Sequence, residues 1–237
     1  MNITIDIETI PAQNPIVRAE IAASIQPPGN ISKADTIALW HIEKKPVAAD
    51  EAWRKTSFDG SSGHICVIGY AFDDDDPIAL WGNDWPRNEA DILFQFFRAI
   101  DEKIALHPNV RPTFIGHNVI DFDLRFIFQR AVMLSVKPSR HIPFSARPWD
   151  DGVYDTMTRW AGTKERIKLD KLARALGVGA KGDLDGSKVW DYVNEGRIAE
   201  VASYCKEDVA MTRAVHRRMT FSTSMIEFPI DSAIDYR

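Results

Sequence analysis

The first eight residues of the chain, MNITIDIE, alternate between polar and apolar side chains from position 2 onward. Alternation with a period of two predicts a β-strand over 2–8, with its three isoleucines on the face toward the core. The opposite face then carries Asp6 and Glu8, about 7 Å apart along the strand. Two like charges on one strand face are typical either of a solvated edge strand or of a site that binds a cation.

Two further strands are predicted over 64–72 (HICVIGYAF) and 77–82 (PIALWG), and the acidic turn at 73–76 makes them a β-hairpin. This turn, DDDD, lacks the spaced acidic pattern of a calcium loop, so we interpret it as solvated. A helix over 88–106 then leads to a short strand that ends in Gly116. Strand and helix follow one another as in an α/β layer fold.

Three more segments show apolar residues at helical spacing and predict helices over 123–134, 169–177 and 196–219. Several prolines interrupt the stretch 12–62, which has one helical piece near 33–43, and we interpret it as a helical and loop insertion in the same domain. A chain of 237 residues, 45% of them hydrophobic, suffices for one substantial core. The sequence therefore predicts a single domain over 1–237.

Composition excludes several classes of function. The net charge of −5 rules out bulk positive charge as the driving force for binding a polyanion, so a nucleic-acid substrate would need metal ions and a local patch. Cys66 and Cys205 form no CxxC and have no accompanying histidine pair, which argues against a disulfide framework or a zinc site. No membrane span or signal peptide is recognisable. We therefore expect a soluble, cytoplasmic protein.

Two other segments carry candidate site residues. In YCKED, Tyr204 and Asp208 lie four residues apart on the predicted last helix, so they share one edge of it. In GHNVIDFD, Asp123 follows a short strand and opens a helix, at the strand exit where α/β folds bind ligands. Taken singly, the first pair is typical of a surface hydrogen bond, and Asp123 of a helix cap for which Asp121 competes.

Together, the segments DIET, GHNVIDFD and YCKED resemble, in this order, the three exonuclease motifs of the DEDD nucleases, most closely the exonuclease domain of family B DNA polymerases. The resemblance lies in D-x-E at Asp6 and Glu8, N-x-x-x-F-D ending at Asp123, and Y-x-x-x-D ending at Asp208. The segments VYDTM and KLDKLARALG also look like the free-standing bacterial relatives of that domain. Tyr204 indicates the tyrosine subclass, called DEDDy.

This resemblance implies a ribonuclease H-like α/β fold with a mixed, largely antiparallel five-stranded sheet flanked by helices. It also implies two Mg²⁺ or Mn²⁺ ions held by Asp6, Glu8, Asp123 and Asp208. By the family's pattern, Asp6 bridges both ions, Glu8 and Asp208 complete the ion that activates water, and Asp123 helps to hold the second. Tyr204 would orient the attacking water, since a phenol with an ordinary pKa of about 10 is a poor base at neutral pH.

Four residues within or beside the motifs are expected to contact the nucleic acid: Thr9, His117, Asn118 and Phe122. For His117, a hydrogen bond to nearby backbone is the favoured alternative. The glycine-rich segment at 177–188 has no phosphate-loop signature, so we interpret it as a flexible loop, with a substrate contact from Lys181 or Lys188 as the alternative.

The leading functional hypothesis is a metal-dependent 3′-5′ exonuclease that acts on DNA ends, single-stranded ends most readily. Proofreading or repair would be natural contexts, and the sequence does not identify a partner polymerase or repair protein. One alternative keeps the chemistry but trims RNA 3′ ends. Another is a subunit that binds ends without cutting, which the presence of all four carboxylates and the tyrosine disfavours.

Overall fold

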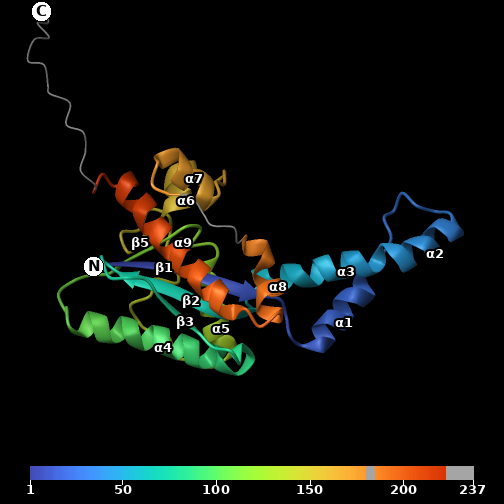
Figure 1. Cartoon of the computed structure of the whole chain (residues 1–237), viewed down its shortest axis with the longest axis horizontal. Helices are drawn as coiled ribbons and strands as arrows, with labels where there is room; N and C mark the ends of the chain where they lie inside the picture. The colour runs from blue at the N-terminus through green and yellow to red at the C-terminus, as the bar shows by residue number, and fades with distance from the viewer. Residues whose placement is uncertain (180–184, 223–237) are drawn as a thin grey trace, which may run out of the picture.

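The computed structural model of the chain describes residues 1–179 and 185–222 (Figure 1). Its centre is a sheet of five strands: β1 (Asn2–Ile10), β2 (His64–Phe72), β3 (Ile78–Trp81), β4 (Thr113–Gly116) and β5 (Val153–Asp155). The strand order is β3-β2-β1-β4-β5. The β1–β2 and β2–β3 pairs are antiparallel, and the β1–β4 and β4–β5 pairs are parallel. The mixed, largely antiparallel sheet is confirmed, because the antiparallel strand pairs join twelve residue positions and the parallel pairs join six.

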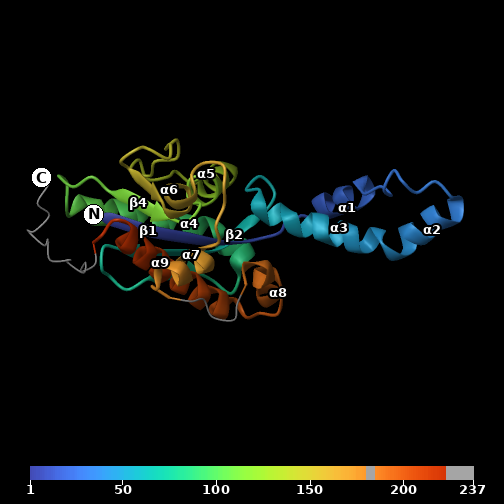
Figure 2. The ribbon, with the colours of Figure 1, turned by 90° about the horizontal axis from the view of Figure 1, so that it is seen from above.

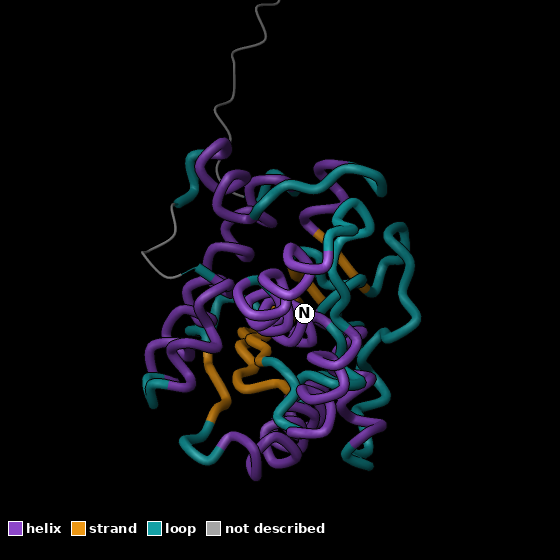
Figure 3. Tube along the Cα trace, turned by 90° about the vertical axis from the view of Figure 1, so that its right-hand side faces the viewer, coloured by secondary structure: helices purple, strands orange, loops and turns teal. Residues whose placement is uncertain are grey.

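Strand β1 lies in the middle of the sheet, between β2 and β4, so the interpretation of 2–8 as a solvated edge strand is wrong. Its residues Ile3, Ile5 and Ile7 pack in a core cluster with the helices α4 (Trp85–Ala105) and α5 (Asp123–Met133). The other sheet face is covered by α8 (Val189–Asn194) and α9 (Ile198–Met219). Figure 2 shows these two helical layers on either side of β1, and in Figure 3 the strands lie among the helices. Both faces of β1 are therefore covered.

The predicted helices are present with shifted ends. Helix α4 begins three residues earlier than predicted, where Pro86 fits the first turn because a proline needs no hydrogen-bond acceptor there. Helix α7 (Leu169–Leu176) ends at Gly177, whose left-handed φ of 66° favours glycine. The hairpin turn at 73–76 is confirmed. None of the helices within residues 1–179 and 185–222 is both long and apolar enough to cross a bilayer.

The sequence did not predict the short elements between β4 and α9, namely β5, α6 (Thr156–Ala161), α8 and the 3₁₀ helix η2 (Gly186–Lys188). Part of the glycine-rich segment predicted to be a flexible loop, including Lys181, lies outside the described residues, whereas Lys188 closes η2.

The insertion at 12–62 contains three helices, α1 (Pro15–Ser24), α2 (Ala34–Glu43) and α3 (Lys45–Arg54), and the 3₁₀ helix η1 (Lys55–Phe58). The three α-helices form an arm that extends to one side of the sheet (Figures 1 and 2). Only α2 was predicted. Trp53 anchors the arm, since its Nε1 donates to the Ala12 carbonyl at 2.7 Å and its ring meets the edge of Trp190 in α8. An ion pair between Arg54 and Asp191 (2.8 Å) adds a second connection.

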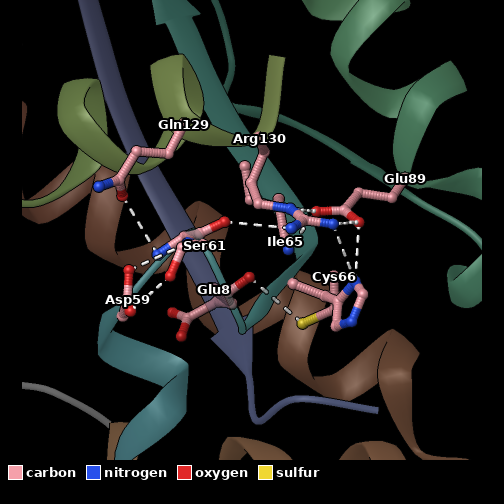
Figure 4. A network of polar contacts seen from close by, with 10 residues as sticks. Glu8, Asp59, Ser61, Ile65, Cys66, Glu89, Gln129 and Arg130 are labelled. Carbon is pink, nitrogen blue, oxygen red and sulfur yellow. Dashed lines mark hydrogen bonds and ion pairs between the residues drawn. The ribbon is translucent and has the colours of Figure 1, made fainter. Parts of the chain in front are cut away.

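A buried ion pair fastens the loop between the arm and β2 (Figure 4). Arg130 of α5 donates from Nε and Nη2 to the two carboxylate oxygens of Glu89 in α4, at 2.7 and 2.8 Å. The remaining Arg130 nitrogen donates to the Gly60 carbonyl (3.1 Å), and Glu89 also accepts from the Ile65 amide (2.9 Å). The ring of His64 lies 2.9 Å from Glu89. One charged pair thus joins α4, α5, β2 and the end of the insertion.

Candidate active site

The carboxylates of Asp6 and Glu8 lie beneath α9, where an oxygen of each and the Cys205 sulfur are within 4.8 Å of one another. The Cys205 thiol donates to Asp6 Oδ2 at 3.3 Å. The β1–β2 register shifts after Glu8, leaving Cys66 as the extra residue, and the Cys66 thiol donates to the Glu8 carbonyl (3.3 Å). A β-bulge of this kind re-aims side chains at the end of a strand. The acidic pair of the first strand therefore lies against a helix, with Glu8 buried and Asp6 half-buried.

Gly69 allows α9 to lie this close to the sheet. It pairs with Asp6 across the β1–β2 ladder. A Cβ at Gly69 would be 2.7 Å from the Cys205 sulfur and 3.0 Å from Val209 Cγ2, closer than real side chains approach. Because Cys205 flanks Tyr204 in the chain, the missing side chain of Gly69 sets how near the tyrosine stands to the carboxylates of β1.

We expect Gly69→Ala to lower the free energy of unfolding by about 1–3 kcal/mol, because the new methyl group overpacks the β2–α9 contact. The matched control is Gly29→Ala in the arm, where a Cβ meets no atom within 4 Å. Urea denaturation of the two variants beside the wild type measures the difference. Equal stability of all three proteins would contradict this account of the contact.

Asp123 is the first residue of α5, and only 3% of it is exposed. Its Oδ1 accepts the Ile7 amide of β1 at 3.0 Å. Since β4 pairs with β1 only as far as Thr4, the Ile7 amide lies beyond the parallel ladder and Asp123 satisfies it. Burial raises the pKa of Asp123 well above its ordinary value, and the negative charges of Asp6 and Asp155 raise it further. Asp123 thus joins the first two sequence motifs, a role beyond that of a helix cap.

Tyr204 and Asp208 are both buried on α9, so the interpretation of this pair as a surface hydrogen bond is wrong. The pKa of Tyr204 is raised well above its ordinary value, by burial first and then by the negative charges of Asp208, Glu8 and Asp6. The phenol therefore keeps its proton at neutral pH. The same charges show that the tyrosine stands within electrostatic range of three of the four carboxylates.

Asp155, which the sequence analysis did not select, organises the loop of the second motif. It is 1% exposed and accepts the amides of Asn118 (3.0 Å) and Ile120 (3.2 Å). It also caps α6 by accepting the Met157 amide at 3.0 Å. A helix-capping aspartate in the segment VYDTM was the available signal. These bonds hold the backbone of Asn118 in the left-handed region, at φ 68°, in the loop five residues before Asp123.

The four expected substrate contacts have different surroundings. His117 Nε2 donates to the Ile167 carbonyl (2.7 Å) and Nδ1 lies 2.9 Å from Thr156 Oγ1, which fits the alternative of a loop histidine bonded to backbone. The hydroxyl of Thr9 donates to the Ser57 carbonyl at 2.7 Å.

Asn118 and Phe122 differ from these two residues. Asn118 Oδ1 is buried and meets no hydrogen-bond donor within the described part of the chain. Phe122 is half-buried, and its ring centroid is 5.7 Å from that of Phe126 and 6.3 Å from that of Phe58.

The donor set fits a hard divalent cation. Asp6, Glu8, Asp123 and Asp208 offer only carboxylate oxygens, the ligands that Mg²⁺ and Mn²⁺ prefer. Burying several like charges together is costly unless a cation neutralises them. Metal binding at the end of β1 would relieve this repulsion.

Comparison with known proteins gives one family and one fold. The sequence model of a family described as "Predicted 3'-5' exonuclease related to the exonuclease domain of PolB" matches residues 62–229, well over half of the chain. The match contains Asn118, Asp123, Tyr204 and Asp208 but begins after Glu8 and after most of the insertion.

Among solved structures, the family B DNA polymerase from the hyperthermophilic archaeon Pyrobaculum calidifontis is similar, with a TM-score of 0.54 and 16% sequence identity. The similarity covers 92% of this chain but 24% of the polymerase, so the chain spans about a quarter of that protein. The comparison with curated proteins returned no match. The polymerase likeness bears on the fold alone, and it agrees with the ribonuclease H-like α/β fold expected from the sequence.

Proposed function

The chain belongs to the family of predicted 3′-5′ exonucleases related to the exonuclease domain of PolB, and we propose that it hydrolyses DNA from the 3′ end, single-stranded DNA most readily. The proposal is carried by the geometry at the end of β1, where oxygens of Asp6 and Glu8 lie within 4.8 Å of the Cys205 sulfur of α9 and Asp123 accepts the Ile7 amide between them. Tyr204 and Asp208 are buried on the same helix as Cys205. These groups come from three segments that are more than eighty residues apart in the sequence. A binding subunit would not need such a costly cluster of buried carboxylates.

The residues that would hold divalent ions are Asp6, Glu8, Asp123 and Asp208. Two bound Mg²⁺ or Mn²⁺ ions would stabilise the attacking and leaving oxygens of a phosphoryl displacement. The protein's own contribution is to fix the carboxylates. Asp123 is held by the Ile7 amide, Asp6 by the Cys205 thiol, and α9 by its contact with Gly69. A scaffold of this kind holds catalytic groups in place before the substrate arrives.

Tyr204 serves as a positioning group for water. Burial and the neighbouring carboxylates raise the pKa of Tyr204, so its hydroxyl carries a proton at neutral pH and can donate or accept a hydrogen bond. Its place four residues before Asp208 on one helix fixes the hydroxyl beside the carboxylates. The water is thereby directed at the terminal phosphodiester.

We expect Tyr204→Phe to lower the rate of hydrolysis by about 10- to 100-fold, the cost of one or two lost hydrogen bonds to a reacting group. Binding of the DNA end should change less than about threefold, since the ring remains. Tyr192→Phe on α8 is the matched control and should behave as the wild type. Single-turnover hydrolysis over a range of protein concentrations separates the two effects. A tenfold weaker end binding with an unchanged rate would refute the positioning role.

A comparison of oligonucleotides tests the proposed substrate. DNA and RNA of one sequence, each single-stranded and as a blunt duplex, are incubated with the protein and Mn²⁺, and the release of mononucleotides is followed. We expect single-stranded DNA to be degraded fastest. Faster degradation of RNA would overturn the assignment to DNA, because an RNA-trimming enzyme would use the 2′-hydroxyl in recognition.

A further inference from the structure

Phe58 is a large apolar side chain exposed beside the candidate active site. It ends η1, and 72% of it is accessible to solvent. Its ring stands 6.3 Å from that of Phe122, at an angle of 61°. Phe122 directly precedes Asp123 in the chain, so the exposed ring contacts the residue next to one of the proposed metal ligands. An exposed aromatic side chain at this place has an open face on which a further ring can pack.

Phe58 stands on a well-anchored segment. The Ser57 carbonyl accepts the hydroxyl of Thr9, the residue that follows Glu8. Thr56 Oγ1 accepts the Ala12 amide at 2.8 Å and donates to the Trp53 carbonyl at 2.6 Å. The backbone opposite is packed so tightly that a Cβ at Gly63 would be 2.5 Å from the Thr56 carbonyl. The ring is therefore presented to solvent from a fixed backbone, which lowers the entropic cost of binding to it.

The position of Phe58 connects two motifs that are distant in sequence. Ser57 touches the residue after Glu8, and the Phe58 ring touches the residue before Asp123. A phosphodiester at the carboxylates would carry its nucleobase alongside this surface. Phe58 comes from the segment 12–62, which joins β1 to β2, and it lies outside the residues matched by the family model, which begin at 62.

We propose that Phe58, together with Phe122, forms the surface on which a nucleobase at the 3′ end of the substrate stacks. The insertion thus contributes a substrate-binding residue to the active site. Every nucleobase has a π-face, so such a surface would hold ends of any sequence. The proposal rests on the proposed exonuclease function.

Phe58→Ala tests the proposal. An oligonucleotide with a fluorescent base analogue, 2-aminopurine, at its 3′ end reports stacking directly, in the Asp208→Ala background where the end is not cut. We expect stacking on the wild-type ring to quench the fluorescence, and Phe58→Ala to remove most of the quenching and weaken binding by about 5- to 30-fold. Phe58→Trp should restore both. Phe94→Ala, an exposed phenylalanine on α4, is the matched control.

A substrate with an abasic 3′ nucleotide separates stacking from other effects. The protein that keeps Phe58 should bind this abasic substrate about as weakly as the Phe58→Ala variant binds the normal substrate. The Phe58→Ala variant should bind the two substrates with equal affinity. If Phe58→Ala weakened the binding of both substrates by the same factor, or left the quenching unchanged, the stacking role would be overturned and the exonuclease function would stand. If the protein with all its native residues neither bound nor shortened either oligonucleotide, the proposed function itself would fail.

Discussion

Replacing Asp6 by alanine should abolish hydrolysis, lowering the rate by at least about 10³-fold at saturating Mg²⁺. The reason is that Asp6 lies at the centre of the acidic cluster: it is close to Glu8, and its charge acts on Asp123 and Tyr204. Loss of a metal ligand removes several kcal/mol of transition-state stabilisation, and each 1.4 kcal/mol is a factor of ten in rate. Initial rates on a labelled single-stranded oligonucleotide measure the effect.

The matched control is Asp121→Ala. Asp121 is an exposed carboxylate two residues from Asp123 and pairs with Arg125 on the helix surface, so its removal should leave the rate nearly unchanged. The metal-free Asp6→Ala protein should be at least as stable as the wild type, because it has lost one of several mutually repelling charges. Mn²⁺ should then raise the melting temperature of the wild type more than that of the variant. Normal turnover by Asp6→Ala would rule out the proposed mechanism.

Replacing Glu89 by alanine should have the largest effect on stability, about 3–5 kcal/mol of unfolding free energy. The change leaves the buried Arg130 guanidinium without its bidentate partner, and breaking a buried pair costs far more than the pair contributes. It also frees the Ile65 amide at the start of β2. Chemical denaturation of wild type and variant measures the loss, and Glu102→Ala, which breaks an exposed pair with Arg98, should cost less than about 1 kcal/mol.

The Glu89 contribution should also depend on pH. Burial raises the pKa of Glu89, but hydrogen bonds from His64, Arg130 and the Ile65 amide lower it by more, so the folded-state pKa lies below the ordinary value of 4.5. The stabilisation is therefore fully present above about pH 4.5 and is lost as the pH falls through the lower, folded-state pKa. The wild type should lose more stability than Glu89→Ala over that range. Parallel stability curves for the two proteins would contradict this account.

The parts of the fold with a clear period were predictable. Alternation predicted β1, and helical spacing predicted α4, α5, α7 and α9 to within a few residues. Alternation could not distinguish a solvated face from one covered by a helix, because Asp6 and Glu8 are polar in either case. The close approach of α9 to these two carboxylates depends on Gly69, and no local pattern marks that glycine as special.

The elements that the sequence did not predict are too short to show a periodic pattern of apolar residues. Strand β5 has three residues, and α6 and α8 have six each, less than two helical turns. Asp155 was overlooked for this reason, since its role becomes apparent only when α6 and the loop at Asn118 are seen to share it. Of the arm, only α2 was predicted. Helix α1 buries no residue and so carries no core-facing pattern, and α3 buries only Trp53.

The candidate carboxylates could be selected from the sequence only as a set. Each had an ordinary local interpretation. The four carboxylates come from three segments that fold together through long-range contacts, such as the bond between Asp123 and the Ile7 amide. No single motif was sufficient to indicate a common site. The three motifs together, in their order along the chain, indicated it.

The most direct test of the proposed exonuclease is incubation of the purified protein with a 5′-labelled single-stranded DNA oligonucleotide, with Mn²⁺ or with EDTA, beside Asp6→Ala. We expect a ladder of products that shortens from the 3′ end, requires the metal and is absent in the variant. An oligonucleotide that stays intact in every lane, or is cut equally by Asp6→Ala, would contradict it.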